Sequence, residues 1–233
     1  MDLWQTVHDH FTSPKSAKDN QTRVSSGLRT WEQTILKTYH TIPGLVLNIG
    51  CGTGREALAL HQQNYSVVGL DIALPELKIA RKTLPSDISL FCTDGLRLPF
   101  NDCSFEHIAM WSQTFGNVPF ESNRKFLLSE CHRLLKPGGT LSFSVHNLET
   151  CEPVAKSKGW ILQAHDPYPG DFLLQGDTPV DAPCYWHYFS QPEILDLCAQ
   201  CGFTPEICEL DSHFGQNWNN LWICVATKEF HSA

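Results

Sequence analysis

One stretch of sequence decides the fold: Leu45-Val46-Leu47-Asn48-Ile49-Gly50-Cys51-Gly52-Thr53-Gly54-Arg55-Glu56-Ala57-Leu58. It opens as an apolar run with no polar side chain before Asn48, which is typical of a buried parallel strand. Glycines at alternate positions follow, and the residues from Glu56 onward predict the start of a helix. A strand that turns through glycine into a helix leaves backbone N–H groups pointing outward, with little side chain to block a ligand. The stretch therefore predicts a site for a nucleotide-like cofactor.

The glycine spacing narrows the choice of cofactor. The spacing is G-x-G-x-G, whereas the dinucleotide fingerprint is G-x-G-x-x-G, whose third glycine lets the helix pack closely on the strand beside a pyrophosphate. This difference disfavours a nicotinamide cofactor. Taken alone, such a loop is also compatible with a structural turn in any α/β protein.

A second apolar segment, Ser66–Ile72, contains a carboxylate near its end. Asp71 lies 21 residues after Gly50, the distance at which an acidic residue reaches ribose hydroxyls across the strand ends. A carboxylate accepts two hydroxyl hydrogen bonds at once and so suits a vicinal diol. We favour ribose binding, and the alternative is that Asp71 caps a helix over Pro75–Leu84.

The remaining core elements follow from similar patterns. Further strands are predicted over Ile88–Cys92, His107–Trp111, Thr140–Val145, Pro205–Leu210 and Leu221–Thr227, and further helices over Asn123–Leu135 and Pro192–Gln200. The run Lys136-Pro137-Gly138-Gly139 predicts the end of the first of these helices.

Several segments resemble motifs of class I S-adenosylmethionine-dependent methyltransferases. The glycine stretch resembles motif I, "LPFNDCSFE" (98–106) is similar to the run LPF-x-D-x-SFD, and "ECHRLLKPGGTLSFSV" (130–145) resembles E-x-x-RvLkPGG. The resemblance covers residues 44–145 with specific motifs and residues 187–227 with weaker ones. The segment after Trp111 lacks the Asn/Asp-Pro-Pro-Tyr/Phe tetrapeptide of adenine and glutamine N-methyltransferases, which disfavours methylation of DNA bases.

The resemblance implies a fold and a domain organisation. The fold is α/β, a seven-stranded Rossmann-like doubly wound sheet with strand order 3-2-1-4-5-7-6 along the chain numbering and an antiparallel last strand. Residues 1–43 would form an N-terminal helical lid, and residues 44–233 a methyltransferase domain in which residues 146–190 form a substrate cap.

The cofactor that the resemblance implies is S-adenosylmethionine, and no metal is expected. Asp94 and Leu96 match the turn that binds adenine through a carboxylate and a backbone N–H. The residues expected to bind the cofactor are Asn48, Gly50, Cys51, Gly52, Gly54, Asp71, Ile72, Asp94, Gly95, Leu96, Trp111 and Ser112. The family usually has an acidic residue in place of Asn48, and an amide brings no charge to the cofactor's ammonium group.

Residues 1–43 carry two sets of apolar side chains with helical spacing. The sets are Trp4, Val7 and Phe11, and then Leu28, Trp31, Ile35 and Leu36. Between them, Ser13-Pro14-Lys15-Ser16 is interpreted as a loop. We expect the first helix to act as the lid and the second to pack on the sheet.

Residues 146–190 break the periodicity and are rich in proline, glycine and aromatic residues. A long irregular stretch in a compact domain is usually functional or disordered, and its aromatic content disfavours disorder. The aromatic residues are Trp160, Tyr168, Phe172, Tyr185, Trp186, Tyr188 and Phe189. We expect this cap to line a pocket for a small or planar acceptor that is methylated on oxygen or nitrogen.

Methyl transfer requires a base only if the acceptor is protonated at the working pH. The candidate catalytic residues are His146, His187 and Tyr188, because they lie in or beside the expected cap and because histidine titrates near neutrality. Packing or contact with the substrate is the alternative role for each of them.

Charge bounds the choice of partner. The chain has 25 acidic and 17 basic residues among 233, a net charge of −8, which disfavours a broad nucleic-acid groove. Two alternatives stay open. Residues 185–190 and 215–218 are similar to wobble-uridine carboxymethyl methyltransferases, which act on tRNA, and the change to Asn48 is compatible with a non-catalytic scaffold.

Other features of the sequence concern the compartment. No apolar run reaches the roughly 18 residues of a membrane helix, and the N-terminus is no signal peptide. The ten cysteines are scattered and are interpreted as buried thiols in a reducing compartment, with Cys198 and Cys201 packing in a helix and binding no zinc. We therefore expect a cytoplasmic protein without a membrane partner, and the sequence indicates no oligomeric state.

Overall fold

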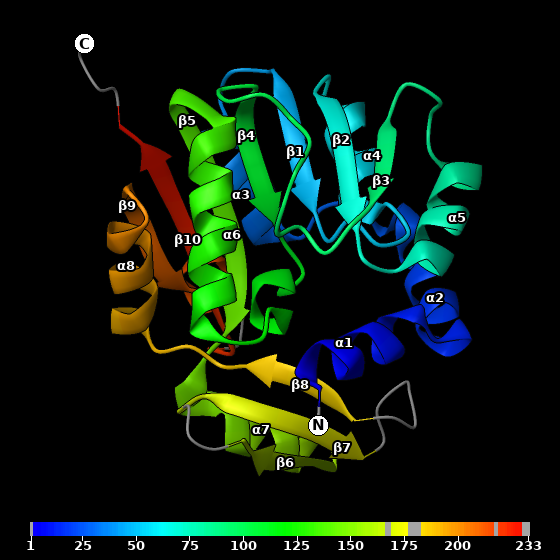
Figure 1. Cartoon of the computed structure of the whole chain (residues 1–233), viewed down its shortest axis with the longest axis vertical. Coiled ribbons are helices and arrows are strands. Elements are labelled where there is room, and N and C mark those ends of the chain that lie inside the picture. Colours follow the sequence, from blue (N-terminus) through cyan, green and yellow to red (C-terminus); the bar gives the residue numbers. More distant parts are fainter. Residues whose placement is uncertain (1, 166–168, 177–182, 217–218, 230–233) are drawn as a thin grey trace.

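The computed structural model describes residues 2–165, 169–176, 183–216 and 219–229 and is built on one seven-stranded sheet (Figure 1). In spatial order the strands are β3 (Ser89–Cys92), β2 (Ser66–Asp71), β1 (Leu45–Ile49), β4 (Phe105–Met110), β5 (Leu135–His146), β10 (Leu221–Lys228) and β9 (Phe203–Leu210). β10 is antiparallel to both neighbours, and the other neighbouring pairs are parallel. The predicted strand order and the antiparallel last strand are confirmed.

Helices cover both faces of the sheet. α3 (Thr30–Thr38), α4 (Arg55–Gln62) and α5 (Leu74–Thr83) pack on one face, and α6 (Glu121–Leu134) and α8 (Gln191–Gln200) on the other (Figure 1). Alternation along β1 decides which face each side chain joins. Leu47 and Ile49 enter the core beside α6, whereas Val46 enters the core beside α3 and α4. Asn48 therefore points toward the α3 and α4 face.

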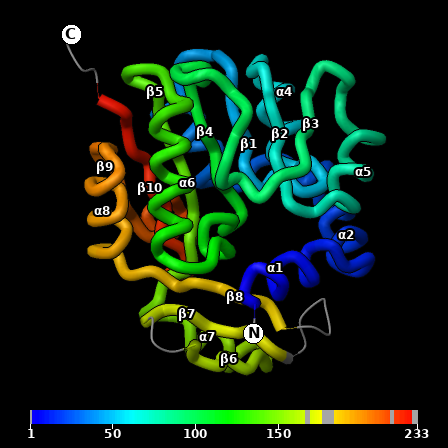
Figure 2. Tube along the Cα trace, in the orientation of Figure 1, coloured from blue at the N-terminus to red at the C-terminus, as the bar shows by residue number. Residues whose placement is uncertain are grey.

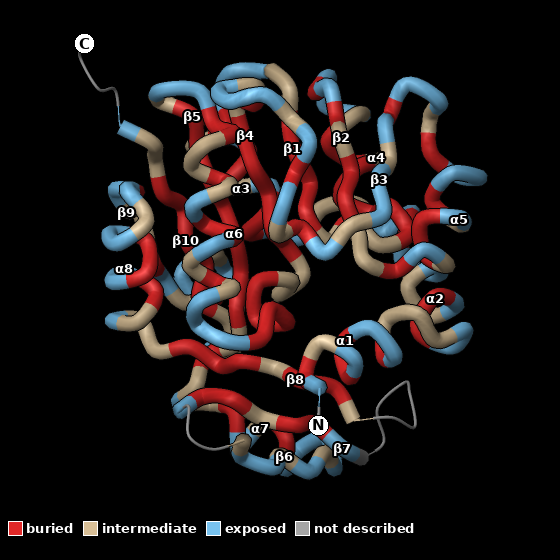
Figure 3. The backbone as a smooth tube through the Cα atoms, viewed as in Figure 1, coloured by how far each residue is buried: buried red, intermediate tan, exposed pale blue. Residues whose placement is uncertain are grey.

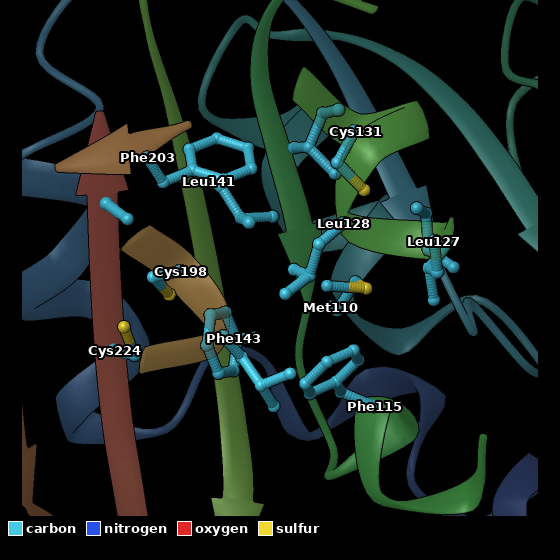
Figure 4. Packing of buried hydrophobic residues seen from close by; sticks show 14 of the residues in the cluster. Met110, Phe115, Leu127, Leu128, Cys131, Leu141, Phe143, Cys198, Phe203 and Cys224 are labelled. Carbon is cyan, nitrogen blue, oxygen red and sulfur yellow. The ribbon is translucent and has the colours of Figure 1, made fainter. Parts of the chain in front are cut away.

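The core lies directly against the sheet. Figure 3 shows the central strands buried along most of their length, with the outer surfaces of the helices exposed. Met110, Leu128 and Phe143 pack between the sheet and α6, in the same cluster as Cys198 and Cys224 (Figure 4). All ten cysteines are free thiols, and Cys198 packs in the core as predicted.

The described part of the chain contains neither a cluster of metal-binding side chains nor a helix that could span a membrane. No group of three or more histidine, cysteine, aspartate or glutamate side chains there could hold a metal ion. None of its helices has both the length and the apolar composition that crossing a membrane requires.

The start of β5 differs from the prediction. The strand begins at Leu135 and not at Thr140, because Leu135 pairs with Phe105 before the register shifts and Thr140 pairs with His107. The glycine-rich run predicted as a helix stop therefore lies inside the strand as a bulge, where Gly138 has a φ of +76°. Such a left-handed residue is what a bulge favours and what glycine adopts without strain.

The N-terminal segment contains one more helix than predicted. α1 (Leu3–Thr12) and α2 (Pro14–Gln21) precede α3, so the interpretation of residues 13–16 as a loop is wrong. The Ser13 hydroxyl accepts from the Ser16 N–H at 3.1 Å, and Pro14 occupies the first helical position. A serine N-cap followed by proline is a helix start, although serine and proline together are also common in loops.

The segment after β5 is also more regular than predicted. It forms α7 (Cys151–Ser157) and a separate antiparallel sheet of β6 (Trp160–Ala164), β7 (Asp171–Gly176) and β8 (Cys184–His187). These elements lie within residues 146–190, for which we keep the name cap. Its strand pattern escaped the sequence analysis because apolar residues occupy both faces of β7, such as Phe172 and Leu173. Tyr168 lies outside the described residues.

The cap and the first two helices gather at one end of the sheet. The arrowheads of β1, β2 and β4 point toward α1 and the cap (Figure 1), and the tube in Figure 2 shows α1 between the sheet and β8. α1 packs against β8, and α2 packs against α5. This arrangement encloses the carboxyl ends of the parallel strands, where α/β proteins bind their ligands.

Candidate active site

A cavity of about 470 Å³ lies at the carboxyl ends of β1, β2 and β4. One part of its wall comes from the glycine stretch and the residues that follow β2 and β3. The other part comes from α1, α2, the end of β5 and the cap. Of the residues predicted to bind cofactor or to act in catalysis, those that line it are Gly50, Cys51, Gly52, Asp71, Ile72, Asp94, Gly95, Ser112 and His146.

The glycine stretch is a tight turn that is closed on β2. Gly50, Gly52 and Gly54 have φ values of +74°, +51° and +98°, and a Cβ at Gly50 would lie 2.1 Å from the Thr114 hydroxyl oxygen. The N–H groups of Gly50 and Cys51 donate to the Leu70 carbonyl at 2.8 and 2.9 Å. These N–H groups therefore do not point outward as predicted; the glycines instead bring bare backbone against the cavity.

Asp71 is held in position by backbone donors. One carboxylate oxygen accepts from the Gly52 N–H at 2.7 Å and the other from the Ala73 N–H at 2.8 Å. Burial raises the pKa of Asp71, and these hydrogen bonds act against that rise. A carboxylate has about four acceptor positions, so the two oxygens keep capacity for a diol in the cavity.

Glu76 is a cavity residue that the sequence analysis missed. Its side chain is buried, and one carboxylate oxygen accepts from the Ser16 hydroxyl at 3.1 Å and from the Asn20 amide at 2.8 Å. Burial and then the neighbouring charge of Asp71 raise the pKa of Glu76 to about 7. Glu76 thus joins α2 to α5 beside the glycine stretch. Nothing local in the sequence indicates this pairing, because α2 was not predicted.

The turn after β3 reaches the cavity only in part. Asp94 and Gly95 line it, and one Asp94 oxygen accepts from the Leu96 N–H at 3.0 Å. The Leu96 N–H is therefore used within the turn, and Leu96 does not line the cavity. The predicted contact of this N–H with the adenine ring stays a prediction, and it would require the N–H to leave Asp94.

Asn48 and Trp111 point away from the cavity, contrary to prediction. The side-chain amide of Asn48 donates to the Ala109 carbonyl at 3.4 Å, and the side-chain oxygen Oδ1 has no hydrogen-bond partner. Trp111 donates to the Ser142 hydroxyl at 3.0 Å and packs edge-on against Trp31. Both residues lie on the sheet face that α3 and α4 cover, so strand alternation removes them from the site. Gly54 is also outside the lining.

A buried ion network supports the glycine stretch from behind. Arg55 donates to the two carboxylate oxygens of Glu32 at 2.7 and 2.6 Å and to Glu56 at 2.5 Å. The Ser112 hydroxyl donates to the same Glu56 oxygen at 2.6 Å. Ser112 and the next residue, Gln113, have φ values of +58° and +64°, so this network fixes a strained turn at the end of β4. Arg55 and Glu56 both line the cavity.

The other part of the cavity is aromatic. Trp4 and Phe11 come from α1, Trp160 from β6 and Trp186 from β8. The His146 ring, at the end of β5, lies edge-on to Trp186 with 4.9 Å between centroids. Burial lowers the pKa of His146 to about 4, and the charges of Lys158 and Arg29 act in the same direction. His146 is therefore neutral at pH 7.

His187 and Tyr188 do not line the cavity, so the structure does not place them where an acceptor could meet them. His187 is 1% exposed, and its two ring nitrogens lie 2.5 Å from Asp171 and 2.7 Å from Glu193. Tyr188 is buried and stacks on His146 with 5.1 Å between centroids. These contacts hold the cap on the sheet, and a catalytic role for either residue stays a prediction.

Comparisons with known proteins agree with this geometry. A family described as a methyltransferase domain matches residues 46–139. The Encephalitozoon cuniculi protein named "Putative methyltransferase ECU09_1500" is 30% identical over 177 residues, which cover 75% of this chain and 78% of that protein. A demethylmenaquinone methyltransferase of Renibacterium salmoninarum is 31% identical over 130 residues, 55% of this chain and 53% of that enzyme. The crystal structure of an S-adenosylmethionine-dependent methyltransferase from Methanosarcina mazei superposes with a TM-score of 0.70 at 22% identity, covering 88% of this chain and 100% of that one.

Proposed function

Because this chain belongs to the S-adenosylmethionine-dependent class I methyltransferases, we propose that it methylates an oxygen or nitrogen atom of a small, planar acceptor. The observation that carries the proposal is the division of one cavity into two parts. Glycines and carboxylates line the part at the strand ends, and aromatic side chains from α1 and the cap line the rest. A flat acceptor between aromatic faces, adjoining the cofactor, fits this division.

The carboxylate part suits the cofactor. Asp71 and Glu76 would share the ribose hydroxyls, because a diol placed between them donates to both and separates their charges. The second oxygen of Asp94 is available for the exocyclic amine of adenine. Glu56 would face the ammonium group and would so take the place of the acid that the family usually has at Asn48.

The residues of the aromatic part position the acceptor and exclude water. When bound, the cofactor supplies a sulfonium methyl group that the acceptor's lone pair takes in line, while the electrons of the broken S–C bond stay on sulfur. Trp160 and Trp186 would stack on the acceptor, and the close walls keep bulk water from the reacting atoms. His146, neutral at pH 7, would accept a hydrogen bond from the acceptor. With a pKa of about 4 it is a weak base, which suits an acceptor that loses its proton readily.

Transfer of labelled methyl groups tests this function. The enzyme and cofactor tritiated on the methyl group are incubated with two acceptor pools, a low-molecular-mass metabolite extract and bulk tRNA. We expect label in the metabolite pool, and we expect the variant Asp71→Asn to lose it through weaker cofactor binding. Label in tRNA, together with a gel shift that weakens with salt, would contradict the proposal and favour the tRNA-modifying alternative.

A further inference from the structure

The cavity contains cationic side chains that form no ion pair with a described carboxylate. Arg23, Arg29 and Lys158 line it, and none of them forms an ion pair within the described ranges. The charges of Glu32 and Glu56 do act on Arg29, where they oppose the lowering of its pKa by burial. Arg55, by contrast, is paired with Glu32 and Glu56. An unpaired cation beside a ligand cavity is a group that a ligand anion can satisfy.

These cations come from two separate segments. Arg23 and Arg29 precede α3 and, with Arg55, also line an adjoining hollow of about 320 Å³. Lys158 follows α7 in the cap, and its ammonium lies 4.4 Å from the centre of the Trp160 ring. Lys158 therefore belongs to the aromatic part of the cavity, and the arginines belong to its N-terminal wall.

The cavity is polarised as a result. Its carboxylates outside the Arg55 network are Asp19, Asp71, Glu76 and Asp94, and none of them comes from the cap. Lys158 is the charged group that the cap contributes to the described lining. The positive charges of Lys158 and Arg29 both oppose protonation of the His146 imidazole. A cationic acceptor is disfavoured here for the same reason.

We propose that the methyl acceptor carries an anionic group, a carboxylate or a phosphate, which Lys158 binds beside the Trp160 ring. This inference rests on the proposed function, because it specifies the acceptor of the same site. A charge-assisted hydrogen bond at the edge of an aromatic wall selects an anionic planar molecule over its neutral isostere. The cofactor also carries a carboxylate, so the test must separate the two sources of anion.

Calorimetry with matched planar probes tests the proposal. The protein saturated with S-adenosylhomocysteine is titrated with 2-naphthoate, 2-naphthyl phosphate and the neutral 2-naphthamide. We expect at least one anionic probe to bind roughly tenfold more tightly than the amide at low salt. The variant Lys158→Gln should remove this preference. The matched control is Lys156→Gln, which removes the same charge from an exposed position on α7 outside the lining and should keep the preference.

Each of the other outcomes contradicts either the anionic acceptor alone or the proposed function as well. Equal binding of anionic and neutral probes, or an unchanged preference in Lys158→Gln, overturns the anionic acceptor but leaves the proposed function standing. No binding of any probe overturns the aromatic acceptor site, and with it the proposed function. If Lys158→Gln weakens S-adenosylhomocysteine but not 5′-methylthioadenosine, which lacks the amino-acid part, Lys158 binds the cofactor's carboxylate and the proposal fails.

Discussion

Glu76 shows how one side chain can couple cofactor binding to the N-terminal segment. It is 2% exposed, lies beside Asp71 and accepts hydrogen bonds from α2. A buried carboxylate without a cation partner is costly in its charged form. The pKa of Glu76 is about 7 in the folded protein and about 4.5 in the unfolded chain. Between these pH values the folded state therefore holds a proton that the unfolded state has released.

We expect Glu76→Gln to be more stable than the natural protein at pH 8, by roughly 1–3 kcal/mol. The raised pKa favours the folded state below about pH 4.5, and this contribution is lost as pH rises through about 7. The neutral amide avoids the loss, so the difference should shrink at pH 5. Urea unfolding at both pH values measures it. A stability gap that does not change with pH would refute the assigned protonation, and the same variant should bind S-adenosylhomocysteine less tightly.

Asn48 illustrates the opposite case, a motif residue with no contact to the site. The resemblance suggests that an acid there would tighten cofactor binding, yet Asn48 is 1% exposed on the α3 and α4 face and its oxygen lacks a partner. We expect Asn48→Asp to lower the free energy of unfolding by about 2–4 kcal/mol, because it buries an uncompensated charge. Chemical denaturation measures this.

The control for position 48 is Asn48→Leu, which removes the unsatisfied amide oxygen without introducing a charge. It should leave the affinity for S-adenosylhomocysteine unchanged in calorimetry. Tighter cofactor binding by Asn48→Asp in a stably folded protein would restore the family-based role of this residue.

The cap is held to the sheet by a network of charged side chains buried from solvent. Asp171 accepts from the Tyr185 hydroxyl at 2.7 Å and lies 2.5 Å from His187, and Arg124 of α6 donates to the same hydroxyl at 3.0 Å. Removing one partner leaves the others buried without compensation. We expect Asp171→Ala to lower stability by about 3–5 kcal/mol in thermal or urea unfolding. The matched change Tyr185→Phe keeps the charged side chains and removes only the hydroxyl's hydrogen bonds to Asp171 and Arg124, so it should cost less, about 1.5–3 kcal/mol; a cost equal to that of Asp171→Ala would show that loss of the charge does not matter.

The first helix covers the aromatic part of the cavity. Trp4, Val7 and Phe11 line it, whereas Leu3 and Val7 pack with Leu173 and Tyr185 of the cap. We expect deletion of residues 1–12 to reduce turnover on the true acceptor by more than tenfold, since it opens the methyl-transfer site to water. Affinity for S-adenosylhomocysteine should change less than threefold, because the carboxylates of the cofactor part remain. A comparable loss in both quantities would place α1 over the cofactor itself.

At the scale of the whole molecule, the sheet was predictable and its additions were not. Apolar strands that end in motif residues, such as Asp71 at the end of β2, predict both strand order and the position of the cavity at the strand ends. The direction of individual side chains could not be predicted where the family motif includes residues on both faces of a strand. For this reason Asn48 and Trp111 were expected to line the cavity, although they lie on the α3 and α4 face of the sheet. Glu76 and Lys158 enter the site through tertiary packing of α2 and the cap, which no local pattern shows.

The closure of the glycine stretch on β2 has a consequence for kinetics. The N–H groups of Gly50 and Cys51 already donate to Leu70, and that of Gly52 donates to Asp71. The loop is therefore preorganised and gains little order when a ligand binds. We expect S-adenosylhomocysteine to leave amide hydrogen exchange over residues 46–56 nearly unchanged and to slow exchange over residues 14–21 of α2, which contact Glu76. The opposite pattern would mean that the loop folds around the ligand. A preorganised loop also means that the opening of α2 sets the rate at which S-adenosylhomocysteine leaves. Substitutions at Ser16 and Asn20 should therefore change its residence time without altering the glycine stretch.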